Sequence, residues 1–162
     1  MIYYLTLPAF LPSQALKYAS SAVIEDGGAL WVLGGLDHGN QVQSITQIVR
    51  PGQPTVWGPD MTEGTADHCS ATLEDNTVMV TGGRRRRRGP HSASARTEVY
   101  SFITQQWTRR EDMNQRRLWH SCSPVWLVTD SRSDPSGGII DTGVTNSSVL
   151  SVVVAGGEPL CL

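Results

Sequence analysis

Short apolar runs separated by turn-forming residues recur along the chain and predict β-strands. The clearest stretch lies in the middle of the chain and closes at His120. It begins with a compact apolar run that ends at the doubled glycine Gly82-Gly83, continues with the alternating segment Thr97 to Phe102, and then reaches Trp107. This order predicts a unit of short strands joined by tight turns.

A similar order of segments precedes this unit. Apolar runs from Ser20 to Ile24, from Leu30 to Gly35 and from Ser44 to Val49 each predict a strand, and Thr55 to Met61 supplies a tryptophan and a methionine. No window of the sequence carries the i, i+3, i+4, i+7 apolar stripe of an amphipathic helix. The 16 glycines and 9 prolines favour turns over long helices. The expected fold class is therefore all-β.

Several of these segments repeat at nearly the same spacing. The separations are 48 residues between Gly34-Gly35 and Gly82-Gly83, 50 between Trp57 and Trp107, 52 between Met61 and Met113, and 52 between His68 and His120. Agreement on a period of about 50 residues indicates a repeat architecture, in which each unit is one supersecondary element.

The period divides the chain into four parts. Residues 1–18 form a poorly specified amino-terminal segment, 19–67 the first repeat, 68–119 the second repeat and 120–162 a partial third repeat. A third doubled glycine, Gly156-Gly157, follows the second by 74 residues. The excess matches a polar segment at about 129–148, which is predicted to be a long disordered loop because it is too polar to pack.

Charge and composition narrow the classes of function. The chain of 162 residues has a formal net charge of −2 and a pI near 6.0, which argues against a nucleic-acid partner. No apolar run approaches the roughly 18 residues of a membrane span, so no membrane partner is expected. The apolar opening lacks a basic region and is interrupted by Pro8 and Pro12, a poor match for a signal peptide. The compartment stays open, with an intracellular location slightly favoured.

The cysteines form an odd and sparse set. Cys69, Cys122 and Cys161 contain no CxxC pair and no cluster with the spacing of zinc ligands. They are therefore expected to be free thiols, buried or partly buried, with neither a disulfide framework nor a structural metal. This expectation also supports the intracellular location.

Taken in order, the repeated residues resemble the kelch repeat of the β-propeller class. The matching residues are Gly34, Gly35, Gly82, Gly83, Gly156 and Gly157, Tyr100, Trp57 and Trp107, Met61 and Met113, and His68 and His120. The second unit matches more fully, since Arg116 or Arg117 also stands in family order. In the first unit, Ile48 or a neighbour replaces the tyrosine and Gly64-Thr65 replaces the arginine. Glycines after a strand can adopt positive φ, and Tyr and Trp on outer strands can pack between adjacent blades.

The resemblance implies four-stranded antiparallel blades. In the second unit the innermost strand would begin at His68, followed outward by Thr77 to Thr81, Thr97 to Phe102 and Gln105 to Arg109. Two complete blades and two strands of a third make about two and a half repeats, whereas propellers close with about four to eight blades. The ring is therefore incomplete. Either the chain is a fragment of a longer protein, which is the favoured interpretation, or it self-associates through open blade edges.

An arginine run directly after the second doubled glycine is the main candidate binding site. The run consists of Arg84, Arg85, Arg86, Arg87 and Arg88. Consecutive like charges repel one another and usually form a solvated segment, which is the plainer interpretation. The resemblance implies that this loop shares the partner-binding face with the loops between blades, which adds Arg110, Arg116 and Arg117. The predicted function is a protein-protein interaction module, a scaffold or part of a substrate adaptor, whose partner is another protein with an acidic peptide segment.

Enzymatic and metal-binding alternatives have less support. His68 and His120 occupy equivalent positions without a third ligand in phase, so a structural role is favoured and neither a metal nor a cofactor is expected. The sequence contains no GxSxG nucleophile elbow and no glycine-rich phosphate loop, so no enzyme is expected. Two alternatives stay open. The chain could be part of a galactose-oxidase-like copper enzyme, or a truncated chain without independent function.

Overall fold

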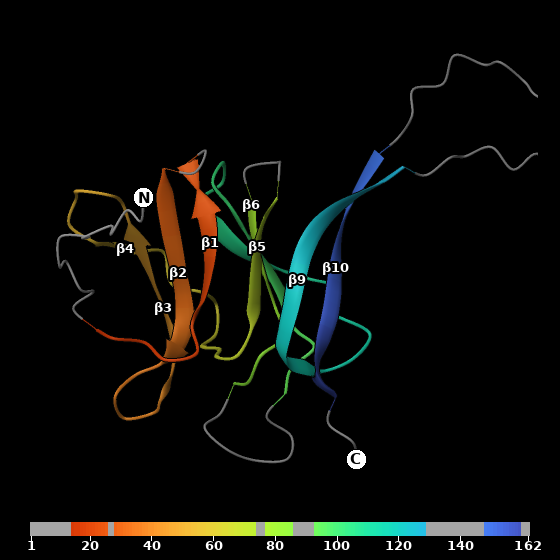
Figure 1. The fold of residues 1–162 in the computed structure, drawn as a ribbon, viewed down its shortest axis with the longest axis horizontal. Helices are drawn as coiled ribbons and strands as arrows, with labels where there is room; N and C mark the ends of the chain where they lie inside the picture. Colours follow the sequence, from red (N-terminus) through yellow and green to blue (C-terminus); the bar gives the residue numbers. More distant parts are fainter. Residues whose placement is uncertain (1–13, 26–27, 74–76, 86–92, 129–147, 160–162) are drawn as a thin grey trace, which may run out of the picture.

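The computed structural model describes residues 14–25, 28–73, 77–85, 93–128 and 148–159. These ranges contain ten β-strands and no α-helix, which confirms the predicted all-β fold class. The strands form three antiparallel sheets that stand side by side in chain order, orange, then yellow to green, then cyan to blue in Figure 1. Within the described ranges, no helix is long and apolar enough to cross a membrane.

The first sheet is a four-stranded meander with the order β1-β2-β3-β4. Its strands are β1 (Ser20–Ile24), β2 (Ala29–Leu36), β3 (Val42–Val49) and β4 (Val56–Gly58). The alternation along β1 buries Ala22 and Ile24 and exposes Val23, as expected when one face of a strand packs and the other does not. Ala22 lies opposite Trp31 of β2, so the buried face carries both.

The second sheet repeats the same meander, with the order β5-β6-β7-β8. Its strands are β5 (Cys69–Leu73), β6 (Thr77–Thr81), β7 (Thr97–Ser101) and β8 (Gln106–Arg110). The four strands expected from the sequence are therefore present, displaced by no more than one residue at either end. The two four-stranded sheets fall within the predicted units 19–67 and 68–119.

The third sheet is a pair of longer strands, β9 (Arg117–Val128) and β10 (Ser148–Pro159). The strand β9 begins before the predicted unit boundary at residue 120, and it contacts β5 of the second sheet. Gly156 and Gly157 lie inside β10, where Gly156 is opposite His120. The predicted polar loop lies, except for Ser148, outside the described residues.

The main core lies between the first two sheets. Trp31 of β2 is fully buried, and its ring meets Tyr100 of β7 edge-on at a centroid distance of 4.9 Å. Trp107 packs against the same tryptophan at 5.6 Å. Leu33 and Val78 complete the most buried part of this cluster. Because large aromatic side chains remove the most apolar surface from water, this contact is expected to dominate the association of the two sheets. The repeat pattern in the sequence indicates Tyr100 and Trp107 but not Trp31.

The doubled glycines Gly34-Gly35 and Gly82-Gly83 lie where a connecting segment packs closely against a strand end. Gly35 N–H donates to the carbonyl of Thr65 and Gly83 N–H to that of Arg117, both at 2.8 Å, so the two sheets repeat this contact. Gly83 has a φ of +82°, and a Cβ there would lie 2.5 Å from Thr65 Oγ1. The expected positive φ is present at all four of these glycines, whereas Gly156 and Gly157 lie inside β10. At Gly83 only a residue without a side chain fits so close an approach.

Trp57 and Trp107, which occupy equivalent places in the predicted repeats, differ in their surroundings. Trp107 is partly buried between the sheets, and its Nε1 donates to the carbonyl of Pro59 at 3.1 Å. Trp57 is 56% exposed. Among the described residues, the predicted packing against an adjacent sheet is therefore seen for Trp107 and not for Trp57. The physical reason is that its face of the first sheet has no neighbouring sheet among the described residues.

The prediction that the cysteines are free thiols is also wrong. Cys69 at the start of β5 and Cys122 in β9 form a disulfide, with Cα atoms 6.0 Å apart. They are 53 residues apart, one more than the separation of His68 and His120, and they come together because β5 and β9 are neighbours in space. Spacing rules for CxxC pairs miss this geometry because it is set by the fold. The lack of a disulfide pattern consequently no longer supports an intracellular location. Cys161 lies outside the described residues.

Candidate functional site

Three connecting segments meet at one end of the first two sheets. Ala66, in the segment after β4, exchanges backbone hydrogen bonds with Arg84 after β6, at 3.0 and 2.7 Å. Ser94, before β7, accepts a hydrogen bond from the backbone N–H of Arg117 at 3.0 Å. An isolated antiparallel bridge between Arg84 and Ala93 completes the chain of contacts. These backbone ties fix the segments relative to one another, although each is a connection rather than a strand.

A cleft of about 620 Å³ opens between these segments. Its lining residues are Val42, Glu63, Gly64, Arg85, Ala93, Ser94, Ala95, Arg96, Arg109, Asp112 and Arg116. Four of them are arginines, drawn from the segment after β6, the segment before β7, the strand β8 and the segment before β9. Positive groups that are far apart in the sequence are thus concentrated in one concave site.

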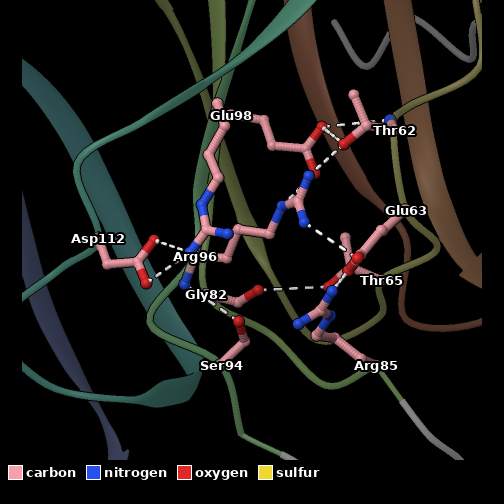
Figure 2. Close-up of polar contacts among 10 residues, drawn as sticks. Thr62, Glu63, Thr65, Gly82, Arg85, Ser94, Arg96, Glu98 and Asp112 are labelled. Carbon is pink, nitrogen blue, oxygen red and sulfur yellow. Dashed lines mark hydrogen bonds and ion pairs between the residues drawn. The ribbon is translucent and has the colours of Figure 1, made fainter.

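Arg96 is held at the centre of the site by acidic and hydroxyl partners (Figure 2). Its Nε lies 2.7 Å from Glu98 Oε1, its Nη1 lies 3.1 Å from Glu63 Oε1, and Thr62 Oγ1 also accepts from it. Glu98 accepts hydrogen bonds from both the hydroxyl and the backbone N–H of Thr62, at 2.7 and 3.2 Å. Glu98 is only 5% exposed, so these contacts replace the water that its carboxylate loses, and they fix the Arg96 side chain.

Glu63 is shared between two arginines. Its carboxylate forms ion pairs with Arg85 and with Arg96, and its side chain is 39% exposed. Burial lowers the pKa of Arg85, and the positive charges of Arg96 and Arg109 lower it further. The solvent-accessible carboxylate of Glu63 therefore offsets the repulsion between the guanidinium groups of Arg85 and Arg96.

The remaining arginines of the cleft are more exposed. Arg109 forms a two-pronged ion pair with Asp112, with Nη2 at 3.0 and 2.9 Å from the two carboxylate oxygens. Arg116 forms no ion pair with the described part of the chain. The cleft accordingly contains a guanidinium group that is free to pair with a ligand.

The structure places the predicted binding arginines in different surroundings. Arg85 and Arg116 line the cleft, as the prediction of a shared basic face requires. Arg84 instead pairs with the buried carboxylate of Asp67. Arg117 does not line the cleft, and its Nη2 donates to Gln115 Oε1 at 2.9 Å. Arg110 is exposed and also does not line it. The other members of the predicted run, Arg86, Arg87 and Arg88, lie outside the described residues.

Two arginines of the cleft were not selected from the sequence. Glu98 of β7 lies opposite Arg109 of β8, and Arg96 precedes Glu98 by two positions. Because side chains alternate across a strand, these three residues share one face of the second sheet. Because both strands of this hairpin are predicted from the sequence, its charge pattern could have indicated that Arg96 and Arg109 lie near Glu98.

His68 and His120 lie in the interior near the inner strands. Both are buried, and His120 Nε2 is 3.0 Å from Thr81 Oγ1. Burial, together with the charge of His120, lowers the pKa of His68 to about 3. Burial and the nearby Arg117 also lower the pKa of His120. Among the described residues, no three His, Cys, Asp or Glu side chains form a group that could hold a metal ion.

No protein-family model matches the sequence, and no curated protein matches it. The similarity to the kelch repeat therefore depends on the identity and spacing of the chain's own residues. The structure adds the four-stranded antiparallel meander, which occurs twice in succession.

Proposed function

We propose that the chain is a protein-interaction module whose arginine-lined cleft binds an acidic peptide segment. The observation that carries this proposal is the convergence of four arginines on one cleft of about 620 Å³. Three carboxylates, those of Glu63, Asp112 and the buried Glu98, pair with these four guanidinium groups, which leaves an excess of one positive charge among the described residues. Guanidinium groups bind carboxylates through paired, charge-assisted hydrogen bonds, so an incoming carboxylate fits this excess.

Glu63 is the group that an acidic ligand would replace. It is the more exposed of the two carboxylates that hold Arg96, and it also engages Arg85. A ligand carboxylate that takes its place would contact both arginines, while Glu63 turns to solvent. This exchange conserves the number of ion pairs, and Arg116 supplies an additional one.

Arg96 gives the cleft a rigid base. Its side chain is 14% exposed and is fixed by Glu98 and Thr62. A guanidinium already held in position loses less conformational entropy when a ligand binds. The site thus combines one preorganised arginine with exposed arginines that can adapt.

The scaffold is interpreted as part of a kelch-type propeller, with the two meanders as blades. Leu30 and Trp57 on the outer face of the first sheet are 40% and 56% exposed. Their equivalents in the second sheet, Val78 and Trp107, pack against the first sheet. A further sheet, from a second copy or from additional sequence, would cover the outer face in the same way and extend the incomplete ring.

The proposal is tested with a fluorescein-labelled peptide that carries adjacent glutamates in a Gly/Ser context, and with a copy in which glutamine replaces glutamate. Fluorescence anisotropy should detect binding of the glutamate peptide only. The double variant Arg85→Gln/Arg116→Gln should weaken that binding by about tenfold or more, as expected for lost charged hydrogen bonds. Arg96 is left unchanged because its removal would leave the buried carboxylate of Glu98 without its ion-pair partner.

Arg50→Gln is the matched control. Arg50 pairs with Glu25 on the first sheet and does not line the cleft. Its substitution removes one positive charge from the protein and should leave peptide affinity unchanged. Equal affinity for the glutamate and glutamine peptides, or equal losses for the cleft and control variants, would show that the cleft is not the site.

A further inference from the structure

Three residues close to the first residues of β1, β5 and β9 form a row at the same end of the sheets as the cleft. Tyr18, Asp67 and Trp119 have φ values of 57°, 56° and 54°. The N–H of Asp67 donates to the carbonyl of Tyr18 at 2.9 Å, and the N–H of Trp119 donates to the carbonyl of Asp67 at 3.0 Å. The row is therefore a repeated backbone feature that links all three sheets.

Side-chain contacts fix the row around one buried ion pair. Trp119 Nε1 donates to Asp67 Oδ1 at 2.8 Å, and Arg84 forms an ion pair with the same carboxylate. The Arg84 guanidinium carbon lies 5.4 Å from the centre of the Tyr18 ring. Asp67 is 6% exposed, whereas Tyr18 and Trp119 are each 58% exposed. Two aromatic rings are thus held at the surface on either side of a neutralised charge.

The backbone of this row does not require aromatic side chains. A positive φ is strained for a bulky residue and is adopted most readily by glycine. The hydrogen bonds along the row come from backbone groups, which any residue other than proline supplies in the same way. Strain of this kind persists where the surrounding structure enforces it, and it recurs here in all three sheets. The indole nitrogen of Trp119 and the ring face of Tyr18 contribute to the contacts around Asp67 and Arg84, while more than half of each side chain stays exposed to a ligand.

The aromatic platform, defined as Tyr18 and Trp119, adjoins the arginine-lined cleft. Arg84 and Arg85 are consecutive residues, and they serve different sites. Arg84 is committed to Asp67 beneath the platform, and Arg85 lines the cleft. A short extended peptide that places a carboxylate beside Arg85 can consequently reach the platform with a nearby side chain.

We propose that the aromatic platform binds an aromatic side chain of the same acidic peptide that the cleft binds. This inference rests on the proposed function and adds a second specificity element to it. Exposed Tyr and Trp rings attract aromatic groups by apolar burial and by edge-to-face or offset packing. Because Asp67 and Arg84 neutralise each other, the platform favours an uncharged ring over a carboxylate, which is directed to the cleft.

The test uses the full chain and peptides in which two glutamates are followed by Gly/Ser spacers of increasing length and then by Phe or Ala. At one spacer length, the Phe peptide should bind about tenfold more tightly than the Ala peptide, the effect of burying one aromatic ring. Tyr18→Gly and Trp119→Gly should each reduce this advantage. Glycine relieves the positive φ, but Trp119→Gly also removes the hydrogen bond to Asp67 and Tyr18→Gly removes the ring over Arg84, so a melting temperature lower by a few degrees is expected and binding is compared well below it.

Trp57→Ala is the matched control, because Trp57 is exposed to a similar degree but lies in β4. It should retain the Phe advantage. Equal binding of Phe and Ala peptides at every spacer, with glutamate dependence intact, would overturn the platform and leave the cleft standing. A Phe advantage that persists when glutamine replaces glutamate would support the platform and overturn the acidic ligand. Absence of binding by every peptide would overturn both.

Discussion

Trp107 in the second sheet donates a hydrogen bond of 3.1 Å from its indole nitrogen to the backbone carbonyl of Pro59, beyond the last strand of the first sheet. The same ring packs on the buried Trp31. Trp107→Ala removes both contacts and leaves a cavity between the sheets, so the free energy of unfolding should fall by roughly 2–3 kcal/mol. Urea denaturation monitored by circular dichroism measures this change.

Trp57→Ala is the internal comparison for that measurement. Trp57 occupies the equivalent place in the first sheet but is 56% exposed. Its removal should change the free energy of unfolding by about 0.5 kcal/mol or less. Similar losses for the two variants would show that the outer face of the first sheet is covered in solution, contrary to the exposure described above.

Gly83 should tolerate no side chain. With φ at +82°, an added Cβ would lie 2.5 Å from Thr65 Oγ1 and 2.6 Å from the carbonyl of Ala66. Gly83→Ala should therefore lower the free energy of unfolding by roughly 3 kcal/mol or more, since backbone atoms must move. Thermal denaturation of the purified variant provides the measurement.

Gly52 separates the effect of the backbone angle from that of the close approach. It has a φ of +70°, but a Cβ there would meet no atom within 4 Å. Gly52→Ala should cost only about 1 kcal/mol, the penalty of a left-handed conformation alone. If both variants lost the same stability, close approach at Gly83 would play no part.

Local patterns predicted most of the fold. The strands of the second sheet are located by the doubled glycine, the alternating segment that contains Tyr100, and Trp107. These signals suffice because turn chemistry and strand periodicity are encoded within a few residues. The exposure of Trp57 was not predictable in this way. It depends on whether a neighbouring sheet is present, which is a property of the assembly.

The candidate site was predicted only in part, for a related reason. Arg85 and Arg84 are neighbours in sequence, yet one lines the cleft and the other pairs with Asp67, 17 residues away along the chain. Arg109 belongs to the site because the hairpin register places it opposite Glu98, and Arg96 because it pairs with the Glu98 carboxylate. Sequence patterns indicate where charges are concentrated, whereas contacts between distant segments decide which of them converge.

The disulfide between Cys69 and Cys122 should stabilise the chain measurably. It closes a loop of 53 residues and joins the third sheet to the second. Its loss should lower the free energy of unfolding by roughly 2–4 kcal/mol, because the unfolded chain becomes less constrained. Urea denaturation with and without dithiothreitol, repeated on the Cys69→Ser/Cys122→Ser variant, measures the effect. Alkylation of these two cysteines in the unreduced, denatured protein would contradict the bond.

Acid should destabilise the folded chain through the buried side chain of His68. Its pKa is lowered to about 3 in the folded protein by burial and by His120, against an ordinary value of 6.5. The unfolded chain therefore binds a proton below about pH 6.5, whereas the folded chain does so only near pH 3. The contribution of His68 to stability is complete above pH 6.5 and is lost as the pH falls towards 3.

Between pH 7.5 and 5.5 the free energy of unfolding of the wild type, measured by urea denaturation, should fall by about 1 kcal/mol, and that of His68→Gln should fall clearly less. His38→Gln, at an exposed loop position, should behave as the wild type does. An unchanged pH dependence in His68→Gln would assign the acid sensitivity to other groups.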